Sequence, residues 1–265
     1  MKLRKMTLNI NGADRSFICD PSTDTLATVI RRLGLTGTKV GCGTGVCGSC
    51  SIILNGKVIR SCTKKISTVE EYSKVLTIEG IGAPNYLHPI QVAWMNYGGV
   101  QCGFCTPGFI VSAYGLLEEN PNPTREDVRD WFQKHRNICR CTGYKQLVDA
   151  VMAAAKVMRG ECAIEDIMVA VPKDGNIDLY GKSLVRPAAI AKVCGLSDYG
   201  DDIELKMPSS TLHVVMVQPK VTHHANLLKV NTEEAEKMPG VYKVITAKDI
   251  IEAGGTNRLA WFACN

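Results

Sequence analysis

The segment GCGTGVCGSC, residues 41–50, places three cysteines and four glycines within ten positions, and a fourth cysteine follows at position 62. Taken as ligands, these cysteines have the spacing C-x4-C-x2-C followed by a later cysteine, which is the plant-type [2Fe–2S] arrangement. A cluster held by four thiolates is anionic, so its sulfurs need backbone N–H donors from a loop with unusual φ values, which glycines permit. The segment therefore predicts a [2Fe–2S] site on Cys42, Cys47, Cys50 and Cys62, shaped by Gly41, Gly43, Gly45 and Gly48.

A second group of four cysteines lies in the stretches QCGFCTPG and NICRCTGY. Cys102 and Cys105 come directly before one predicted helix, and Cys139 and Cys141 come directly before another. A helix N-terminus carries partial positive charge and free N–H groups, both of which stabilise thiolates and anionic clusters. A CxxC pair with a distant CxC pair therefore suits a second iron–sulfur centre.

Zinc is the main alternative metal for both groups, because structural zinc sites also use four cysteine ligands. Their usual pairs are CxxC…CxxC, and the first group contains a single such pair, Cys47 and Cys50; the spacing of the second group is less diagnostic. A dithiol redox motif would explain CGFC but leaves Cys139 and Cys141 without a role. Disulfides suit the chain less well, since it is long and shows no secretory signal.

Composition excludes several functional classes. The chain has 265 residues and a net charge of +5 without a dense basic block, so nothing points to nucleic acid or to an anionic membrane surface. The N-terminal residues alternate like a strand and lack an apolar signal region, and no stretch approaches the ~18 apolar residues of a membrane helix. We expect a cytoplasmic protein that binds neither nucleic acid nor membrane.

The remaining cysteines and the histidines of the C-terminal part carry no predicted site. Scattered cysteines are interpreted as small buried hydrophobes or spare thiols. Neighbouring histidines in a strand point to opposite faces, so they would not share one ion. These residues are Cys19, Cys162, Cys194, Cys264, His213, His223 and His224.

The first 80 residues alternate between strand and turn signals. A strand over 6–10, an Asn11-Gly12 turn and a strand over 17–19 predict an opening hairpin. A helix with apolar positions from Leu26 to Leu33 follows, capped by Ser22 or Thr23 and ended by Gly34. Further strands are expected over 51–54, 58–62 and 75–78, with Asn55-Gly56 as a second hairpin turn. This order is that of a β-grasp sheet, as in plant-type ferredoxins.

Four helical patterns replace the strands after Glu79. The first begins near His88 and ends at Gly98-Gly99, and the second begins at Pro107 behind a Thr106 cap. The third follows a capping box at Thr124 and Asp127, and the fourth begins near Tyr144. Short helices with brief connections predict a bundle.

The fold class expected is α+β, with three structured parts and a connector. We predict a β-grasp ferredoxin-like domain over 1–80 and a four-helix-bundle domain over 81–160. A connector spans 161–184, and residues 185–265 open a mixed α/β domain. Alternating apolar residues predict strands in this last part, at Val214 and Met216 and at Val241, Val244 and Ile245.

These motifs, in this order, resemble the iron–sulfur segment of the molybdenum hydroxylases, the xanthine oxidase and aldehyde oxidoreductase family, over residues 3 to 160. The resemblance implies one [2Fe–2S] cluster on the first four cysteines and another on Cys102, Cys105, Cys139 and Cys141. It also implies that Gln101 and Cys141 lie against the pterin of a molybdopterin cytosine dinucleotide cofactor. The amide of Gln101 can donate and accept, which suits a pterin edge, although a helix-end cap explains it equally well.

Residues 185–265 resemble the opening of the family's molybdenum-binding portion. No flavin-domain segment precedes them, so the resemblance implies a flavin-free aldehyde oxidoreductase without FAD. The family's catalytic glutamate lies beyond Asn265, so no catalytic residue is expected here. The chain would relay electrons from aldehyde oxidation at molybdenum, through the helical-domain cluster first, to an external acceptor.

The resemblance also implies partners. They are the molybdenum-binding portion or subunit, an acceptor such as ferredoxin or flavodoxin, and further copies in a homo-oligomer of the whole enzyme. Two other hypotheses stay open, a stand-alone ferredoxin-type electron carrier and a zinc-stapled interaction module.

Overall fold

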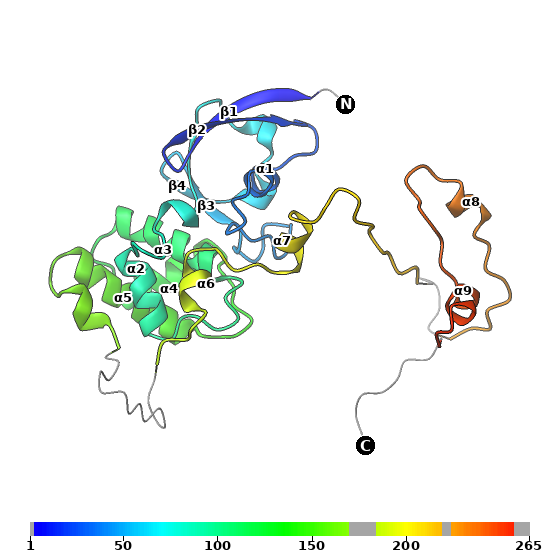
Figure 1. Ribbon diagram of the computed structural model, residues 1–265. Coiled ribbons are helices and arrows are strands. Elements are labelled where there is room, and N and C mark those ends of the chain that lie inside the picture. The colour runs from blue at the N-terminus through cyan, green and yellow to red at the C-terminus, as the bar shows by residue number, and fades with distance from the viewer. Residues whose placement is uncertain (1–2, 170–183, 219–223, 257–265) are drawn as a thin grey trace, which may run out of the picture. The chain divides into compact units, whose positions relative to one another are not determined.

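The computed structural model describes residues 3–169, 184–218 and 224–256. These residues form two units, Met1–Lys206 and Met207–Asn265 (Figure 1). His223, Cys264 and most of the predicted connector lie outside the described residues. The domain boundaries expected near residues 80, 160 and 184 stay predictions.

A five-stranded sheet forms the N-terminal half of the first unit, with strand order β2-β1-β5-β3-β4. The predicted hairpins are confirmed, since β1 pairs antiparallel with β2 and β3 with β4. Asn11 and Gly12 take the left-handed φ values, 53° and 83°, that a two-residue hairpin turn requires. β1 also runs parallel to β5, which closes the β-grasp order. The strands are β1 (Arg4–Ile10), β2 (Ala13–Cys19), β3 (Ser51–Leu54), β4 (Lys57–Arg60) and β5 (Lys74–Leu76).

Helix α1 (Leu26–Arg32) covers one face of this sheet (Figure 1). Its apolar residues pack with those of the strands in one core, which includes Met6, Leu8, Ile10, Leu26, Val29, Ile30, Ile52 and Val75. The predicted cap at Ser22 or Thr23 is wrong, because Thr25 accepts from the backbone N–H of Thr28. Ser22 is engaged elsewhere, since both its N–H and its hydroxyl donate to Asp20.

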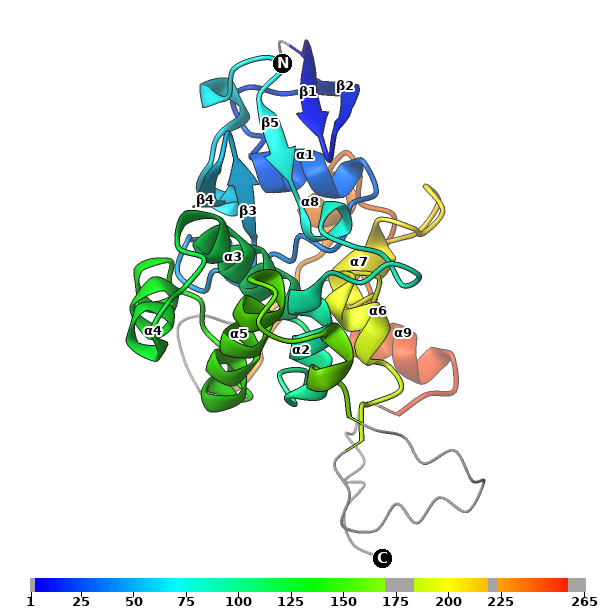
Figure 2. The same ribbon diagram turned by 90° about the vertical axis from the view of Figure 1, so that its left-hand side faces the viewer.

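Four helices pack beneath the sheet, as Figure 2 shows. Adjacent residues of β3 point to opposite faces, so Ile52 joins the sheet core while Ile53 joins the helical core. The helical core is built around Trp94, Phe109, Phe132 and Val151. The helices are α2 (Pro89–Asn96), α3 (Thr106–Glu119), α4 (Arg125–Lys134) and α5 (Tyr144–Met158).

Among these four helices, the starts agree with the predictions except at α3. Thr124 and Asp127 form the expected capping box, and Gly98 ends α2 with φ 73°. At α3, Cys105 occupies the N-cap position and Thr106 is already helical. The predicted strand through Cys62 also ends early, because Ser61–Thr63 turns as a 3₁₀ helix. Both deviations fall at thiols, where the backbone leaves regular structure.

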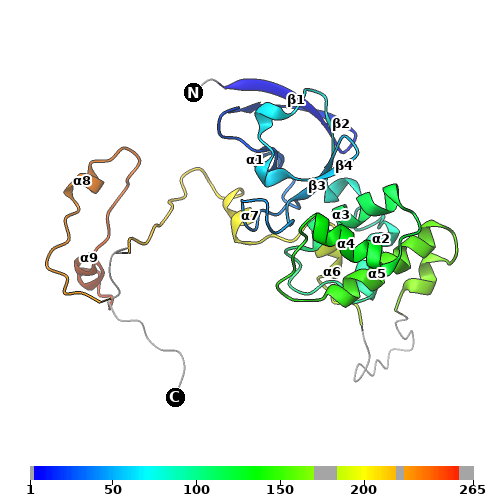
Figure 3. The same cartoon turned by 180° about the vertical axis from the view of Figure 1, so that it is seen from behind.

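Two short helices, α6 (Ala189–Val193) and α7 (Gly200–Glu204), complete the first unit after a 3₁₀ turn at Ile164–Ile167. Val193 and Cys194 are buried in the helical core, so α6 packs on the bundle. α7 lies beside α1 and the loop that follows it (Figures 1 and 3). This return of the chain joins both halves of the unit.

The second unit contains α8 (Glu233–Glu236) and α9 (Ala247–Glu252). The strands predicted around Val214 and Val241 are wrong for its described residues, which contain helices, turns and irregular backbone but no strand. Val214 and Met216 are 91% and 80% exposed. A segment gains stability as a strand only by pairing with another, and no described segment pairs with these residues.

Candidate iron–sulfur sites

The loop between α1 and β3 directs backbone N–H groups at sulfur, as its glycines predict. Thr44 and Val46 donate to Cys42 Sγ at 3.4 and 3.3 Å, and Cys62 donates to Cys50 Sγ at 3.5 Å. Three of the glycines have left-handed backbone, with φ of 66° at Gly43, 75° at Gly45 and 67° at Gly48. Gly41 instead leaves room for a thiol, because a Cβ at this position would lie 3.2 Å from Cys47 Sγ.

The thiols of the first group differ in pKa. Burial acts against ionisation of Cys42, yet hydrogen bonds from Thr44, Cys47 and Val46 lower the pKa of this exposed thiol to about 6. Burial, followed by a hydrogen bond with Cys50 and the charge of that thiol, raises the pKa of Cys62 to about 12. A bound metal centre would supply the positive charge that a buried pair of thiolates lacks.

The structure also brings the second group together, although its members come from two loops. Cys105 lies against Cys139, and burial followed by the charge of Cys139 raises the pKa of Cys105. Cys102 lies against Cys141, and hydrogen bonds with Cys102 lower the pKa of Cys141. As predicted, Cys102 and Cys105 precede α3, and Cys139 and Cys141 precede α5.

Two side chains hold this second group in place. Gln101 Nε2 donates to the backbone oxygen of Cys141 at 3.2 Å, so Gln101 ties the two loops together and does not cap a helix end. Tyr144 Oη accepts from the N–H of Cys139 at 2.8 Å and donates to its carbonyl at 3.2 Å. The family resemblance implied a shared pterin site for Gln101 and Cys141, but nothing in the sequence singled out Tyr144 for this role.

The loops that carry the two thiol groups contact each other directly. The N–H of Ile138 donates to the carbonyl of Cys47 at 3.0 Å, and Asn137 Nδ2 donates to the carbonyl of Gly48 at 3.3 Å. A Cβ on Gly48 would lie 2.8 Å from the carbonyl oxygen of Arg136. The sequence analysis did not predict this contact. Its only signal in the sequence was Gly48, since so close an approach of two backbones requires a glycine.

The residues present fit two iron–sulfur clusters. In a four-cysteine [2Fe–2S] centre each iron takes two protein sulfurs. Cys50 with Cys62, Cys102 with Cys141, and Cys105 with Cys139 already lie in such pairs, and Cys47 donates its N–H to Cys42. Across the described ranges, no three His, Cys, Asp or Glu side chains converge as ligands of a single ion.

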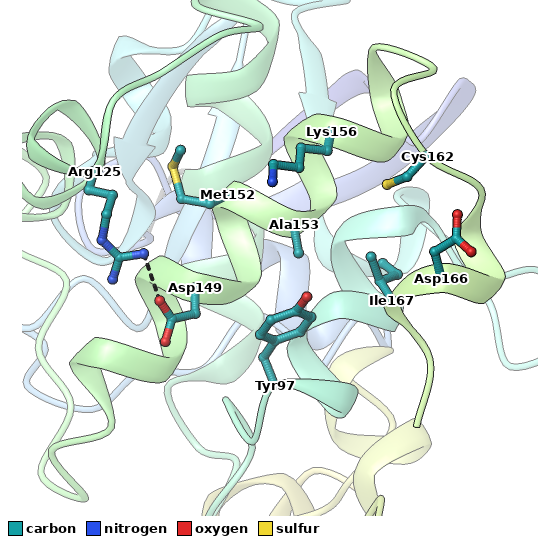
Figure 4. A pocket seen from close by; sticks show the side chains of 9 residues that line it. All are labelled: Tyr97, Arg125, Asp149, Met152, Ala153, Lys156, Cys162, Asp166 and Ile167. Atoms are coloured by element: carbon teal, nitrogen blue, oxygen red, sulfur yellow. Dashed lines mark ion pairs between the residues drawn. The ribbon is translucent and has the colours of Figure 1, made fainter. Parts of the chain in front are cut away.

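A separate hollow of about 400 Å³ lies on the helical part, and Figure 4 shows its lining. Arg125 and Asp149 form an ion pair at 2.7 Å on its wall, and Cys162 lies at the other side. None of the eight grouped thiols lines it, so we do not count it as part of the iron–sulfur sites. In the part of the chain that the structure describes, no helix is both long and apolar enough to cross a bilayer.

Comparison with known proteins supports the same two domains. A family model described as a 2Fe-2S iron-sulfur cluster binding domain matches residues 8–76. A second model, described as a [2Fe-2S] binding domain, matches residues 77–152. The boundary between the two models falls where the chain passes from the sheet to the helices.

Individual relatives extend the similarity. The aldehyde oxidoreductase of Megalodesulfovibrio gigas is 54% identical over 253 residues, which are 95% of this chain and 27% of that protein. The nicotinate dehydrogenase small FeS subunit of Eubacterium barkeri is 37% identical over 151 residues, 57% of this chain and 94% of that subunit. The crystal structure of the aldehyde oxidoreductase from Desulfovibrio desulfuricans ATCC 27774 superposes with a TM-score of 0.88 at 56% identity, covering 93% of this chain and 27% of that one. The chain thus spans about a quarter of the length of these aldehyde oxidoreductases.

Proposed function

The chain belongs to the molybdenum hydroxylase family, of which it is an iron–sulfur part, and on this premise we propose that it conducts electrons in an aldehyde oxidoreductase. The enzyme as a whole would oxidise an aldehyde to a carboxylic acid. One observation carries the proposal. Two groups of paired thiols are joined by the hydrogen bond between Ile138 N–H and the Cys47 carbonyl, which gives a short bonded path from one group to the other.

We assign the eight grouped cysteines as cluster ligands. Cys42, Cys47, Cys50 and Cys62 would hold one [2Fe–2S] cluster, and Cys102, Cys105, Cys139 and Cys141 the other. Such a cluster, when bound, accepts and releases one electron at a time. The protein's own part is to fix sulfur positions, as Tyr144 does for Cys139, and to aim N–H donors at sulfur, as Thr44 and Val46 do.

The side of the second group that carries Gln101 and Cys141 would face the molybdenum cofactor. The amide of Gln101 and the loop of Cys141 lie next to one another, and such an edge of donors and acceptors suits a pterin. The cofactor proposed is molybdopterin cytosine dinucleotide, held mainly by the molybdenum-binding portion. No FAD is assigned to this chain.

The first group would face the electron acceptor. Cys42 is exposed, Val46 is 46% exposed, and the Arg60 guanidinium lies near Gly45. An exposed cluster edge with a basic neighbour suits an acidic carrier such as ferredoxin or flavodoxin. The whole enzyme is proposed to be a cytoplasmic homo-oligomer.

Metal analysis of the purified full chain tests the proposal. We expect four irons and four acid-labile sulfides per chain, as two [2Fe–2S] centres require. Dithionite reduction should give two distinguishable [2Fe–2S] signals by electron paramagnetic resonance (EPR). Zinc without iron would instead identify a zinc-stapled module, and a single signal would identify a simple ferredoxin-type carrier. Either result would end the proposal.

A further inference from the structure

The segment from α6 to α7, residues 189–204, contacts both thiol-bearing parts of the first unit. It is anchored on the bundle, where Gln91 Nε2 donates to the carbonyl of Val193 at 3.0 Å. Figure 3 shows α7 beside α1 and the loops below it. The cluster-binding motifs do not include this segment, so its role has to be read from its contacts.

Asp202 ties the segment to the sheet domain through a buried charge network. Its two carboxylate oxygens accept from Arg31 Nη1 and from Lys39 Nζ, each at 2.7 Å. The side chains of Lys39 and Asp202 are each 1% exposed. Lys39 also donates to the carbonyl of Ser197 at 2.8 Å. Because Lys39 precedes Cys42 by three residues, the network fixes the start of the first thiol loop.

Tyr199 and Lys192 tie the same segment to the second thiol loop. Tyr199 Oη donates to the carbonyl of Cys102 at 2.8 Å, and Lys192 Nζ donates to the carbonyl of Gln101 at 2.9 Å. The Tyr199 ring also packs edge-on against Phe104, with centroids 5.1 Å apart. The contact is close, since a Cβ on Gly103 would lie 2.8 Å from Tyr199 Oη.

Tyr199 joins the two sets of contacts. Its ring lies 4.9 Å from Lys39 Nζ, and its backbone N–H donates to Asp202 at 2.9 Å. One tyrosine therefore touches the charge network on one side and the Cys102 loop on the other. A buried ion pair contributes little net stability compared with apolar residues of the same shape, so stability alone does not explain this arrangement.

We propose that Asp202 and Tyr199 are positioning residues that hold the two thiol loops at a fixed separation and so set the coupling between the two clusters. This inference rests on the proposed function, because it requires both clusters to be present. Arg31, Lys39 and Asp202 together carry a net charge of +1, which favours the more negative, reduced state of a nearby cluster.

The variant Tyr199→Phe tests the link to the second loop in the full chain loaded with both clusters. It keeps the ring contact with Phe104 but removes the donor to Cys102. We expect full iron content and a reduced magnetic splitting between the two reduced clusters by low-temperature EPR. Tyr86→Phe is the matched control, since Tyr86 is 79% exposed, and it should give the wild-type spectrum.

The variant Asp202→Asn tests the charge network. It leaves Arg31 and Lys39 buried without their anion and makes the surroundings more positive. A redox titration followed by EPR should therefore show an upward shift in the potential of at least one cluster. Asp201→Asn is the control, because Asp201 is exposed and contacts Arg31 through its backbone oxygen alone among the contacts described. It should leave both potentials unchanged.

The outcomes separate the two proposals. Wild-type chain without iron would refute the function proposed above. Full iron content, with unchanged splitting in Tyr199→Phe and unchanged potentials in Asp202→Asn, would refute the positioning role. If Asp202→Asn does not fold, the splitting in Tyr199→Phe decides the question.

Discussion

The two thiol groups reach similar arrangements by different routes. The first lies within residues 42–62: one loop, whose left-handed glycines turn N–H groups toward sulfur, carries Cys42, Cys47 and Cys50, and Cys62 follows after the β3–β4 hairpin. The second is assembled from two loops that meet only because α3 and α5 pack in the same core. Cys42 is exposed, whereas Cys139 is buried. Local sequence therefore shapes the first site, and tertiary packing shapes the second.

The largest effect expected is the selective loss of one cluster. Cys47→Ser should abolish the EPR signal of the first cluster, and Cys139→Ser that of the second, because each removes one of four ligands. Each variant should retain the other signal, since each group has its own supporting hydrogen bonds. Loss of both signals in a variant whose circular dichroism is unchanged would show that the groups are not independent.

A smaller effect should separate close packing from loop strain. Gly48 and Gly43 have nearly equal φ values, but a Cβ on Gly48 would meet the Arg136 carbonyl, while nothing lies within 4 Å of one on Gly43. We expect Gly43→Ala to lower the free energy of unfolding by about 1 kcal/mol through strain. Gly48→Ala should cost about 3 kcal/mol, because overpacking adds to the strain. Urea unfolding measures both, and equal losses would contradict the close contact between the loops.

The two halves should also differ in their response to acid. The sheet domain contains no histidine, whereas His88 caps α2 by accepting from the N–H of Ile90 at 3.2 Å. Burial lowers the pKa of His88, so the folded state favours the neutral ring. Its contribution is complete above the unfolded pKa of about 6.5 and is lost as the pH falls through the lower folded value.

Hydrogen exchange of the α2 amides between pH 7 and pH 5 measures this effect. Protonation removes the cap acceptor, which should weaken α2 by about 1 kcal/mol. His88→Asn retains an acceptor that does not titrate, so its α2 should show a flatter profile. An unchanged profile would mean that other groups, such as His135, whose pKa burial also lowers, dominate the acid response.

The smallest differences are expected at surface ion pairs. The Arg4–Glu71 pair of the sheet domain is 3.7 Å long, with side chains 51% and 43% exposed. In the helical part, Asp149 is 22% exposed and pairs with both Arg125 and Lys145. Glu71→Gln should therefore change the unfolding free energy by less than about 0.5 kcal/mol, and Asp149→Asn should lower it by about 1 kcal/mol. Thermal unfolding of both variants measures these losses. An equal or larger loss in Glu71→Gln would show that exposure does not control the effect.

Local signals predicted most of the fold. The Asn-Gly turns and the capping box of Thr124 and Asp127 act within a few residues, so their physics is visible in the sequence. The fold class and the ferredoxin-like order of strands followed from them. The same local reasoning failed at Ser22, whose hydrogen bonds to Asp20 compete with capping.

Long-range contacts could not be predicted in this way. Asp202 pairs with Arg31 across 171 positions, and no periodicity or spacing links the two residues. The strands expected around Val214 need pairing partners that the described residues do not provide. The grouping of the eight cysteines was readable in each motif, but the contact between the groups depends on how α3 and the sheet pack.

The hydrogen bond from Ile138 to Cys47 makes position 138 tolerant of most substitutions. Both of its atoms belong to the main chain, and the Ile138 side chain is 48% exposed. Side chains at this position are thus free to vary in size and polarity without interrupting the bridge. Proline is the exception, because it lacks the N–H, so Ile138→Pro is the one exchange there that removes the donor itself.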